Sequence, residues 1–322
     1  MVTLNMTPWL TTVWAQLCAH SPPHGLLLCG PEGIGKGVLA RHWAQTLLCE
    51  DSPAPCQHCP ACEWFQAGIH PDFRELVPPV HQVDATPQDT GEWITIDQVR
   101  ELGDFMMVSA HRQGWKIILI DPADTLNGAA ANALLKSLEE PPPRTLFILV
   151  TAHMARIPST LRSRCRIQQV PLPSLGQAGD WLRQQGVDDP EGFLRRAGGA
   201  PQRALSQWQK DAEGRRSFLS FFLDSEMPWL QRAEKLANLD QPAWIDWFQY
   251  AVMDLILCKL NGRVYYHEDQ LAGFQRVAST LSLPDLLTWE QCLRNARRWM
   301  AHPLNERLLY ESLFYPLQPS VS

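Results

Sequence analysis

Residues 26–37 read Leu26-Leu27-Leu28-Cys29-Gly30-Pro31-Glu32-Gly33-Ile34-Gly35-Lys36-Gly37. The apolar run predicts a buried strand, the glycines predict a tight turn, and the residues from Val38 onward have the apolar spacing of a helix. Such a turn lets backbone N–H groups and one ammonium surround a phosphate group. The pattern therefore predicts an α/β fold with a phosphate-binding loop (P-loop), whose nucleotide-binding residues are Gly30, Gly33, Gly35 and Lys36.

Two positions depart from a working P-loop ATPase. The residue after the lysine should be Ser or Thr, because that hydroxyl holds magnesium, and here it is Gly37. A second apolar run, 116–120, ends in Asp121, which matches the carboxylate that supports magnesium; the next residue should be a Glu that polarises water, but it is Pro122. Losing one group that acts in the transition state commonly costs orders of magnitude in rate. We therefore expect ATP and Mg²⁺ to bind weakly or not at all, and intrinsic hydrolysis to be absent.

Strand-like and helical runs alternate through the first half of the chain. The predicted strands are 25–29, 73–77, 116–120, 146–151 and 167–170, and the predicted helices are 8–19, 37–49, 96–107, 129–139 and 158–162. This alternation is typical of a parallel sheet covered on both faces, with ligands at the carboxyl ends of its strands. After Pro171-Leu172-Pro173 the strand patterns stop, and the remaining chain has helical patterns that are rich in aromatic residues.

Four cysteines lie close together in the sequence, at Cys49, Cys56, Cys59 and Cys62. Two C-x-x-C steps share Cys59, so one loop can present several sulfurs to a single ion. The segment is proline-rich and has few apolar residues, so it has no core of its own. Four protein ligands would leave no position for water. We predict a structural Zn²⁺ site; the alternative is a loop of free cysteines.

Composition narrows the class of protein. The 322 residues are enough for two or three domains. No apolar run approaches the ~20 residues that span a bilayer, and residues 1–10 lack the pattern of a secretory signal, so we expect a cytoplasmic protein with no membrane partner. Nine cysteines are then not expected to form disulfides. The net charge of −6 argues against a strongly basic nucleic-acid-binding protein.

The α/β region ends with Thr160-Leu161-Arg162-Ser163-Arg164-Cys165. Alone, this is a basic turn, in which Arg164 could serve a local salt bridge. In context, Ser163-Arg164-Cys165 resembles the triplet by which clamp-loader subunits reach a neighbour's ATP site, and the chain as a whole resembles bacterial clamp-loader subunits of the AAA+ class. The other carriers of the resemblance are the cysteine loop, His70-Pro71-Asp72, Ile96-Asp97-Gln98-Val99-Arg100, residues 131–142, Gly198-Gly199-Ala200-Pro201-Gln202-Arg203-Ala204-Leu205 and Asn305-Glu306-Arg307-Leu308-Leu309-Tyr310-Glu311.

The resemblance implies three domains: an AAA+-like P-loop domain at 1–171 with the zinc loop (49–62) inserted, a small helical lid at 172–208, and an all-α collar at 209–322. It also implies a heteropentameric ring with gamma/tau-type motor subunits and a delta-type subunit, which acts on a sliding clamp and primed DNA within the DNA polymerase III holoenzyme. In such a ring the chain is similar to the stator, which hydrolyses no ATP but lends Arg164 as a trans-acting arginine finger. Arg203 takes the sensor position of the lid, as a vestigial nucleotide-binding residue.

Three alternatives make different demands on the sequence. An active motor subunit would need Ser or Thr at position 37 and Glu at position 122. A zinc-dependent nucleic-acid-binding protein would need a basic zinc module, whereas residues 50–63 contain three acids and no Lys or Arg. A polymerase would need a pair of metal-binding carboxylates placed for nucleotidyl transfer, and the sequence presents none.

Overall fold

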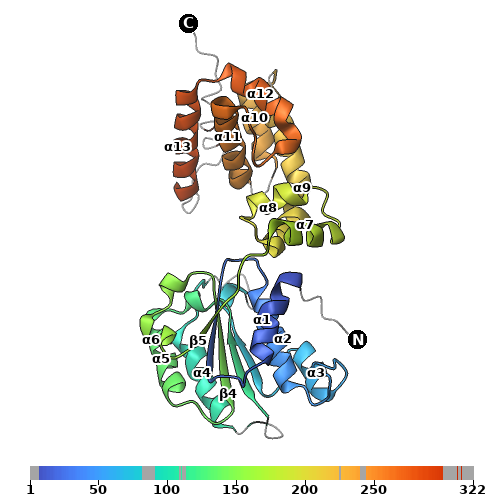
Figure 1. Cartoon of the computed structure of the whole chain (residues 1–322). Helices are drawn as coiled ribbons and strands as arrows, with labels where there is room; N and C mark the ends of the chain where they lie inside the picture. Colours follow the sequence, from blue (N-terminus) through green and yellow to red (C-terminus); the bar gives the residue numbers. More distant parts are fainter. Residues whose placement is uncertain are drawn as a thin grey trace. The chain divides into compact units, whose positions relative to one another are not determined.

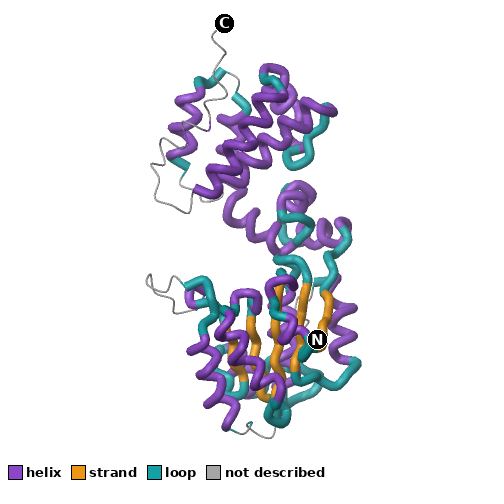
Figure 2. The backbone as a smooth tube through the Cα atoms, turned by 90° about the vertical axis from the view of Figure 1, so that its left-hand side faces the viewer, coloured by secondary structure: helices purple, strands orange, loops and turns teal. Residues whose placement is uncertain are grey.

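The computed structural model describes residues 7–81, 91–108, 110, 114–224, 226–239, 244–299, 310 and 313. The chain divides into two compact units, Met1–Gln177 and Ala178–Ser322, and the division falls inside helix α7 (Leu175–Gln184). The first unit contains the sheet and the second is helical (Figures 1 and 2). Most of the motif Asn305–Glu311 lies outside the described residues, which include only Tyr310 of it. None of the described helices combines the length and apolarity needed to cross a membrane.

A five-stranded sheet forms the centre of the first unit. Its strands are β1 (Gly25–Cys29), β2 (Phe73–Leu76), β3 (Lys116–Ile120), β4 (Thr145–Thr151) and β5 (Arg166–Gln169). They pair in the order β2-β3-β4-β1-β5, and every pair is parallel. β3 and β4 are buried along their whole length, as expected for strands covered on both faces. The predicted α/β class is confirmed, and each predicted strand boundary lies within one residue of the observed one.

Helices cover both faces of the sheet. One face carries α1 (Thr11–Cys18), α2 (Lys36–Leu48) and α3 (Pro60–Gln66), and the other carries α4 (Ile96–Met107), α5 (Gly128–Glu139) and α6 (Ser159–Arg162) (Figure 1). Local sequence explains their ends. For α5, the Asn127 side chain accepts a hydrogen bond from the Ala130 N–H at 2.8 Å, and prolines follow the last turn. Short 3₁₀ turns lie at Pro8–Leu10, Pro79–His81, Ala123–Thr125 and Met154–Arg156.

The second unit contains two hydrophobic clusters. Its helices are α7, α8 (Pro190–Arg196), α9 (Pro201–Phe222), α10 (Trp229–Ala237), α11 (Trp244–Asn261), α12 (Leu271–Thr280) and α13 (Leu283–Trp299), with a 3₁₀ turn at Glu268–Gln270. One cluster joins α7, α8 and the start of α9; the other is aromatic and is centred on Phe218, Phe222, Phe248, Phe274 and Trp289. Helix α9 contributes to both clusters, and the predicted boundary at residue 208/209 lies inside it.

A polar network joins the two clusters inside this unit. The buried Arg196 of α8 donates a hydrogen bond to the Tyr266 carbonyl at 2.6 Å and pairs with Asp189 at 3.2 Å. Its own carbonyl accepts a bond from the Tyr250 hydroxyl of α11 at 2.9 Å. The fully buried Asp254 accepts the Tyr266 N–H at 3.0 Å. Because these groups are buried and paired, they fix α8 against α11.

Candidate functional site

The glycine loop connects β1 to α2 at the carboxyl edge of the sheet. Gly33 (φ 74°) and Gly35 (φ 96°) adopt left-handed conformations that few other residues tolerate. The Lys36 ammonium is buried and donates hydrogen bonds to the carbonyls of Gly30 at 2.8 Å and Pro31 at 2.6 Å. Burial lowers the pKa of Lys36, against the opposing attraction of Asp121. The ammonium that would contact phosphate thus closes the loop on its own backbone.

A side chain at position 37 would require the Asp121 carboxylate to move. A Cβ atom built on Gly37 would lie far inside van der Waals contact with Oδ2 of Asp121, and 3.3 Å from Nη1 of Arg41. Asp121 therefore occupies the volume in which the magnesium-binding side chain of a working loop begins. Burial raises the pKa of Asp121, while the neighbouring Arg41 lowers it.

Two further charges near the loop are paired with each other. Arg41 of α2 binds both carboxylate oxygens of Glu75 on β2, with 3.2 Å between Nε and Oε2. This pair ties α2 to the edge of the sheet beside Asp121. The sequence analysis missed Glu75, which follows Arg74 in a short strand and has no distinguishing signal in the sequence.

Asp124 does not replace the missing glutamate. Its Oδ1 accepts a hydrogen bond from the Thr151 hydroxyl at 2.6 Å and one from the Ala152 N–H at 3.3 Å. Asp124 lies in the 3₁₀ turn after β3 and is buried against the end of β4. The turn thus directs the Asp124 carboxylate to hydrogen bonds at the end of β4.

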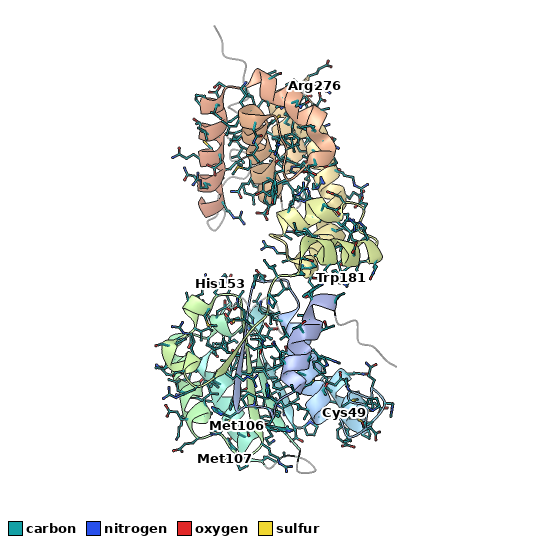
Figure 3. All side chains as sticks on the ribbon, in the orientation of Figure 1. Cys49, Met106, Met107, His153, Trp181 and Arg276 are labelled. Atoms are coloured by element: carbon teal, nitrogen blue, oxygen red, sulfur yellow. The ribbon has the colours of Figure 1, made fainter. Side chains whose placement is uncertain are left out.

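The four cysteines come together between α2 and α3. All four sulfurs lie within 4.8 Å of one another, with 3.9 Å between Cys49 and Cys59 and 4.0 Å between Cys56 and Cys62. Zn–S bonds of ~2.3 Å in a tetrahedron place sulfurs ~3.8 Å apart, whereas a disulfide would place them ~2.05 Å apart. The cluster is therefore compatible with a tetrahedral zinc ion. Cys49, labelled in Figure 3, lies close to α3, which Figure 1 labels in the same orientation.

Backbone amides surround these sulfurs. N–H groups of Cys56, Cys59 and Cys62 point at the sulfurs of Cys49, Cys56 and Cys59, at 3.3, 3.3 and 3.4 Å. Burial raises the pKa of Cys59, but backbone hydrogen bonds from Glu50 and Cys62 outweigh it and bring the pKa to about 7. These bonds favour the Cys59 thiolate, the form that binds metal, whereas burial raises the pKa of Cys49 and raises that of Cys62 to about 12.

Arg164 lies near the amino-terminal ends of the strands, whereas the glycine loop lies at their carboxyl-terminal ends. It precedes β5, whose first residue pairs with Leu26 near the start of β1, whereas the loop follows the end of β1. A strand of this length spans about 13 Å at ~3.3 Å per residue. The Arg164 side chain is 34% exposed and pairs with Glu139 at 2.5 Å, so the local salt bridge left open by the sequence is present.

The predicted residues thus form three groups. The first group surrounds the start of α2 and consists of Gly30, Gly33, Gly35, Lys36 and Asp121. The four cysteines form the second group, and Arg164 stands apart from both. Arg203 belongs to the first turn of α9 in the second unit, and its role toward a nucleotide stays a prediction.

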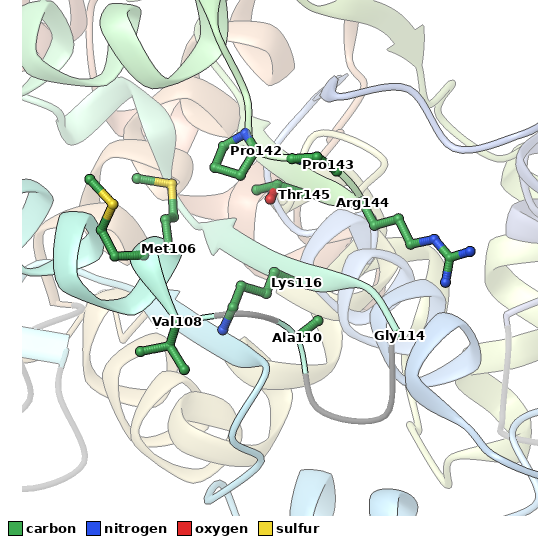
Figure 4. Close-up of a pocket in the computed structure, with 10 residues that line it drawn as sticks. Met106, Val108, Ala110, Gly114, Lys116, Pro142, Pro143, Arg144 and Thr145 are labelled. Atoms are coloured by element: carbon green, nitrogen blue, oxygen red, sulfur yellow. The ribbon is translucent and has the colours of Figure 1, made fainter.

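A cavity of about 490 Å³ also lies at the amino edge of the sheet (Figure 4). Its described lining includes Met106 at the end of α4, Lys116 at the start of β3, and Pro142, Pro143 and Thr145 before and at the start of β4. None of the predicted site residues lines it. This cavity is therefore separate from the nucleotide loop.

Comparison with known proteins gives consistent results. The family described as "DNA polymerase III, delta subunit" matches residues 10–174. The chain is 36% identical to DNA polymerase III subunit delta′ of Pseudomonas aeruginosa over 258 residues, covering 76% of this chain and 75% of that protein. It is 32% identical to subunit delta′ of Escherichia coli over 261 residues, covering 77% and 75%. Among solved structures, a DNA polymerase III gamma subunit-related protein from Thermotoga maritima shares the fold, with a TM-score of 0.50, 19% identity, and coverage of 95% of this chain and 97% of that one. The chain belongs to the family of DNA polymerase III delta′ subunits.

Proposed function

We propose that this protein is a non-hydrolysing stator subunit of the DNA polymerase III clamp loader, and that its Arg164 completes the ATP site of a neighbouring motor subunit. In this proposal it joins gamma/tau-type motor subunits and a delta-type subunit in a five-membered ring. The ring loads a sliding clamp onto primed DNA. Relatives named gamma and tau subunits, each similar to 44% of this chain, support such partners.

The observation that carries the proposal is the separation of the finger from the chain's own loop. Arg164 lies about 13 Å or more from the glycine loop, at the other edge of the sheet. It is partly exposed, so a second subunit can approach it. The planar, permanently charged guanidinium suits the spreading negative charge of phosphoryl transfer. We therefore assign Arg164 to the nucleotide of a neighbouring subunit and not to the glycine loop of its own chain.

The chain's own loop supports the same division of roles. Asp121 fills the space at Gly37, Lys36 is bonded to the loop carbonyls, and Pro122 supplies no general base. With neither a magnesium-binding hydroxyl nor a water-polarising carboxylate, hydrolysis lacks two groups that act in the transition state. In this proposal the vestigial site binds ATP and Mg²⁺ weakly or not at all.

The cysteine cluster has a structural role in this proposal. Cys49, Cys56, Cys59 and Cys62 would hold one Zn²⁺, whose four protein ligands leave no position for water. The ion would supply the cross-link that the proline-rich segment needs to fold. The chain's own backbone amides supply the hydrogen bonds that orient the sulfurs.

Replacing Lys36 tests whether the loop is silent. We expect Lys36→Met, which keeps the buried aliphatic stem, to leave clamp- and DNA-stimulated ATP turnover of the reconstituted loader unchanged. The corresponding lysine substitution in a motor subunit is the control and should abolish turnover at that subunit. A clear fall in turnover with Lys36→Met would show that this loop takes part in the ring's ATP cycle and would contradict the proposal.

Restoring a hydroxyl at position 37 should not restore catalysis. We expect Gly37→Thr to lower the free energy of unfolding by about 1–3 kcal/mol, because the new side chain must displace Asp121 from a packed site. ATP turnover by the isolated chain should remain at background. Gly128→Thr is the matched control, because Gly128 also stands in the first turn of a helix and a Cβ there meets nothing within 4 Å. Urea unfolding and an ATPase assay of both variants decide the outcome; turnover by Gly37→Thr would refute the argument.

A further inference from the structure

We propose that Glu139 is a positioning residue for the finger: it holds the Arg164 guanidinium at rest and competes with the phosphate groups of the neighbour's nucleotide. This inference rests on the proposed function of Arg164. It adds a carboxylate that regulates when the finger becomes available.

Glu139 is the last residue of α5, and Arg164 follows α6, which packs beside α5 (Figure 1). Nη2 of Arg164 lies 2.5 Å from Oε1 of Glu139. Nη1 donates to the Thr160 carbonyl at 2.9 Å and lies 3.3 Å from the Ser163 hydroxyl. Both terminal nitrogens of the guanidinium fork are therefore engaged. A phosphate that takes the Nη1 and Nη2 side of the fork with two parallel hydrogen bonds competes with Glu139.

The backbone holds the two partners together. A Cβ atom built on Gly25 would lie 3.1 Å from the Leu138 side chain, 3.1 Å from the Cys165 sulfur and 3.2 Å from the Arg164 carbonyl. The absence of a side chain at Gly25 thus lets the end of α5 and the Arg164 segment meet over the start of β1. The carboxyl end of α5 also favours a nearby cation through the helix dipole. The ion pair is consequently built into the packing of this edge.

The sequence around the pair isolates it from other acids. Residues 141–179 contain five arginines and no Asp or Glu, and Glu139 and Glu140 are the acids that directly precede this segment. Among the described residues, no ion pair involves Arg156, Arg162 or Arg166. Glu139 therefore serves Arg164 selectively.

The strength of the pair suits a reversible restraint. The side chains are 34% and 49% exposed, and ion pairs of such exposure contribute at most about 1 kcal/mol. One carboxylate carries a single negative charge, whereas a nucleoside triphosphate presents several negative charges and many acceptor oxygens. A bound nucleotide in the neighbour thus outcompetes Glu139, and an empty or misaligned site does not.

The test uses the full chain in the reconstituted loader, with ATP turnover measured with and without sliding clamp and primed DNA. We expect Glu139→Gln to raise turnover in the absence of clamp and DNA by about two- to fivefold, the factor that corresponds to losing a partly exposed ion pair. Turnover with clamp and DNA at saturating ATP should stay at the wild-type value. Glu140→Gln is the matched control, since that neighbouring carboxylate is exposed, and it should behave as wild type in both conditions.

Two comparisons make the outcome specific. In an Arg164→Ala background, Glu139→Gln should have no effect, because the two side chains act as one unit. Thermal unfolding midpoints of all variants should match, which excludes a general loss of structure. The inference would be overturned if Glu139→Gln has wild-type turnover, or if it loses turnover in both conditions. The proposed finger would still stand in either case, provided that Arg164→Ala remains impaired. If Arg164→Ala itself has no effect, the proposed function fails and this inference fails with it.

Discussion

Replacing Arg164 by alanine is expected to lower ATP turnover at the neighbouring motor site by about 10³-fold or more, the range found for arginine fingers in phosphoryl transfer. The guanidinium would neutralise charge that spreads over the transferred phosphoryl group, and alanine supplies no donor for it. Because the Arg164 side chain is partly exposed, the substitution should leave the fold intact. The measurement is single-turnover hydrolysis in a ring whose other motor sites have been inactivated.

Two variants control this experiment. Arg164→Lys keeps the charge but loses the planar fork, so it should recover little of the activity. Arg166→Ala removes another arginine two residues away, which is exposed on β5, and should retain full turnover. Equal losses from Arg164→Ala and Arg166→Ala would point to general electrostatic attraction, and no loss from either would refute a trans-acting finger.

Removing a zinc ligand should have the second large effect. We expect Cys59→Ser to lose the metal and unfold the segment from Cys49 to Gln66, because structural zinc contributes about 10–16 kcal/mol of apparent binding free energy to such modules. Cys59 is buried and caps α3: its sulfur lies 3.9 Å from that of Cys49 and accepts the Cys62 N–H. Zinc content per chain by mass spectrometry or atomic absorption, with limited proteolysis of the segment, measures the result.

The same site should depend on pH in one direction. Zinc binds thiolates, so a fall in pH protonates the sulfurs and releases the ion, whereas a rise in pH favours retention.

Cys292→Ser is the control for the Cys59→Ser experiment, since that thiol is exposed and belongs to the second unit. A Cys59→Ser chain that keeps one zinc ion and resists proteolysis would show that the cysteines do not form a metal centre.

Local pattern was sufficient for most of the α/β unit. The strands 25–29 and 116–120 were predicted to the residue, because continuous apolar runs bounded by glycine, proline or aspartate have few other solutions in a parallel sheet. The prolines at 141–143 also mark the end of α5, which was predicted at its observed last residue, Glu139. The second unit was harder to divide, because α9 is a single helix that packs into two clusters, and periodicity does not reveal a change of partner along one helix.

The candidate sites divide along the same line. The four cysteines were grouped from their spacing in the sequence, and the structure brings their sulfurs together. Partners brought together by tertiary packing were not found from sequence: Glu75 reaches Arg41 across 34 positions, and Glu139 reaches Arg164 across 25. Each is an ordinary surface glutamate in the sequence, and only the contact between elements gives it a meaning.

The carboxylate of Asp121 over Gly37 also has an evolutionary consequence. A substitution at position 37 alone brings the new side chain against the Asp121 carboxylate. A Pro122→Glu substitution alone adds a base beside a loop that lacks its metal ligand. Neither step alone yields a working enzyme, and the first one lowers stability. Regaining hydrolysis would therefore need changes at positions 37 and 122 together.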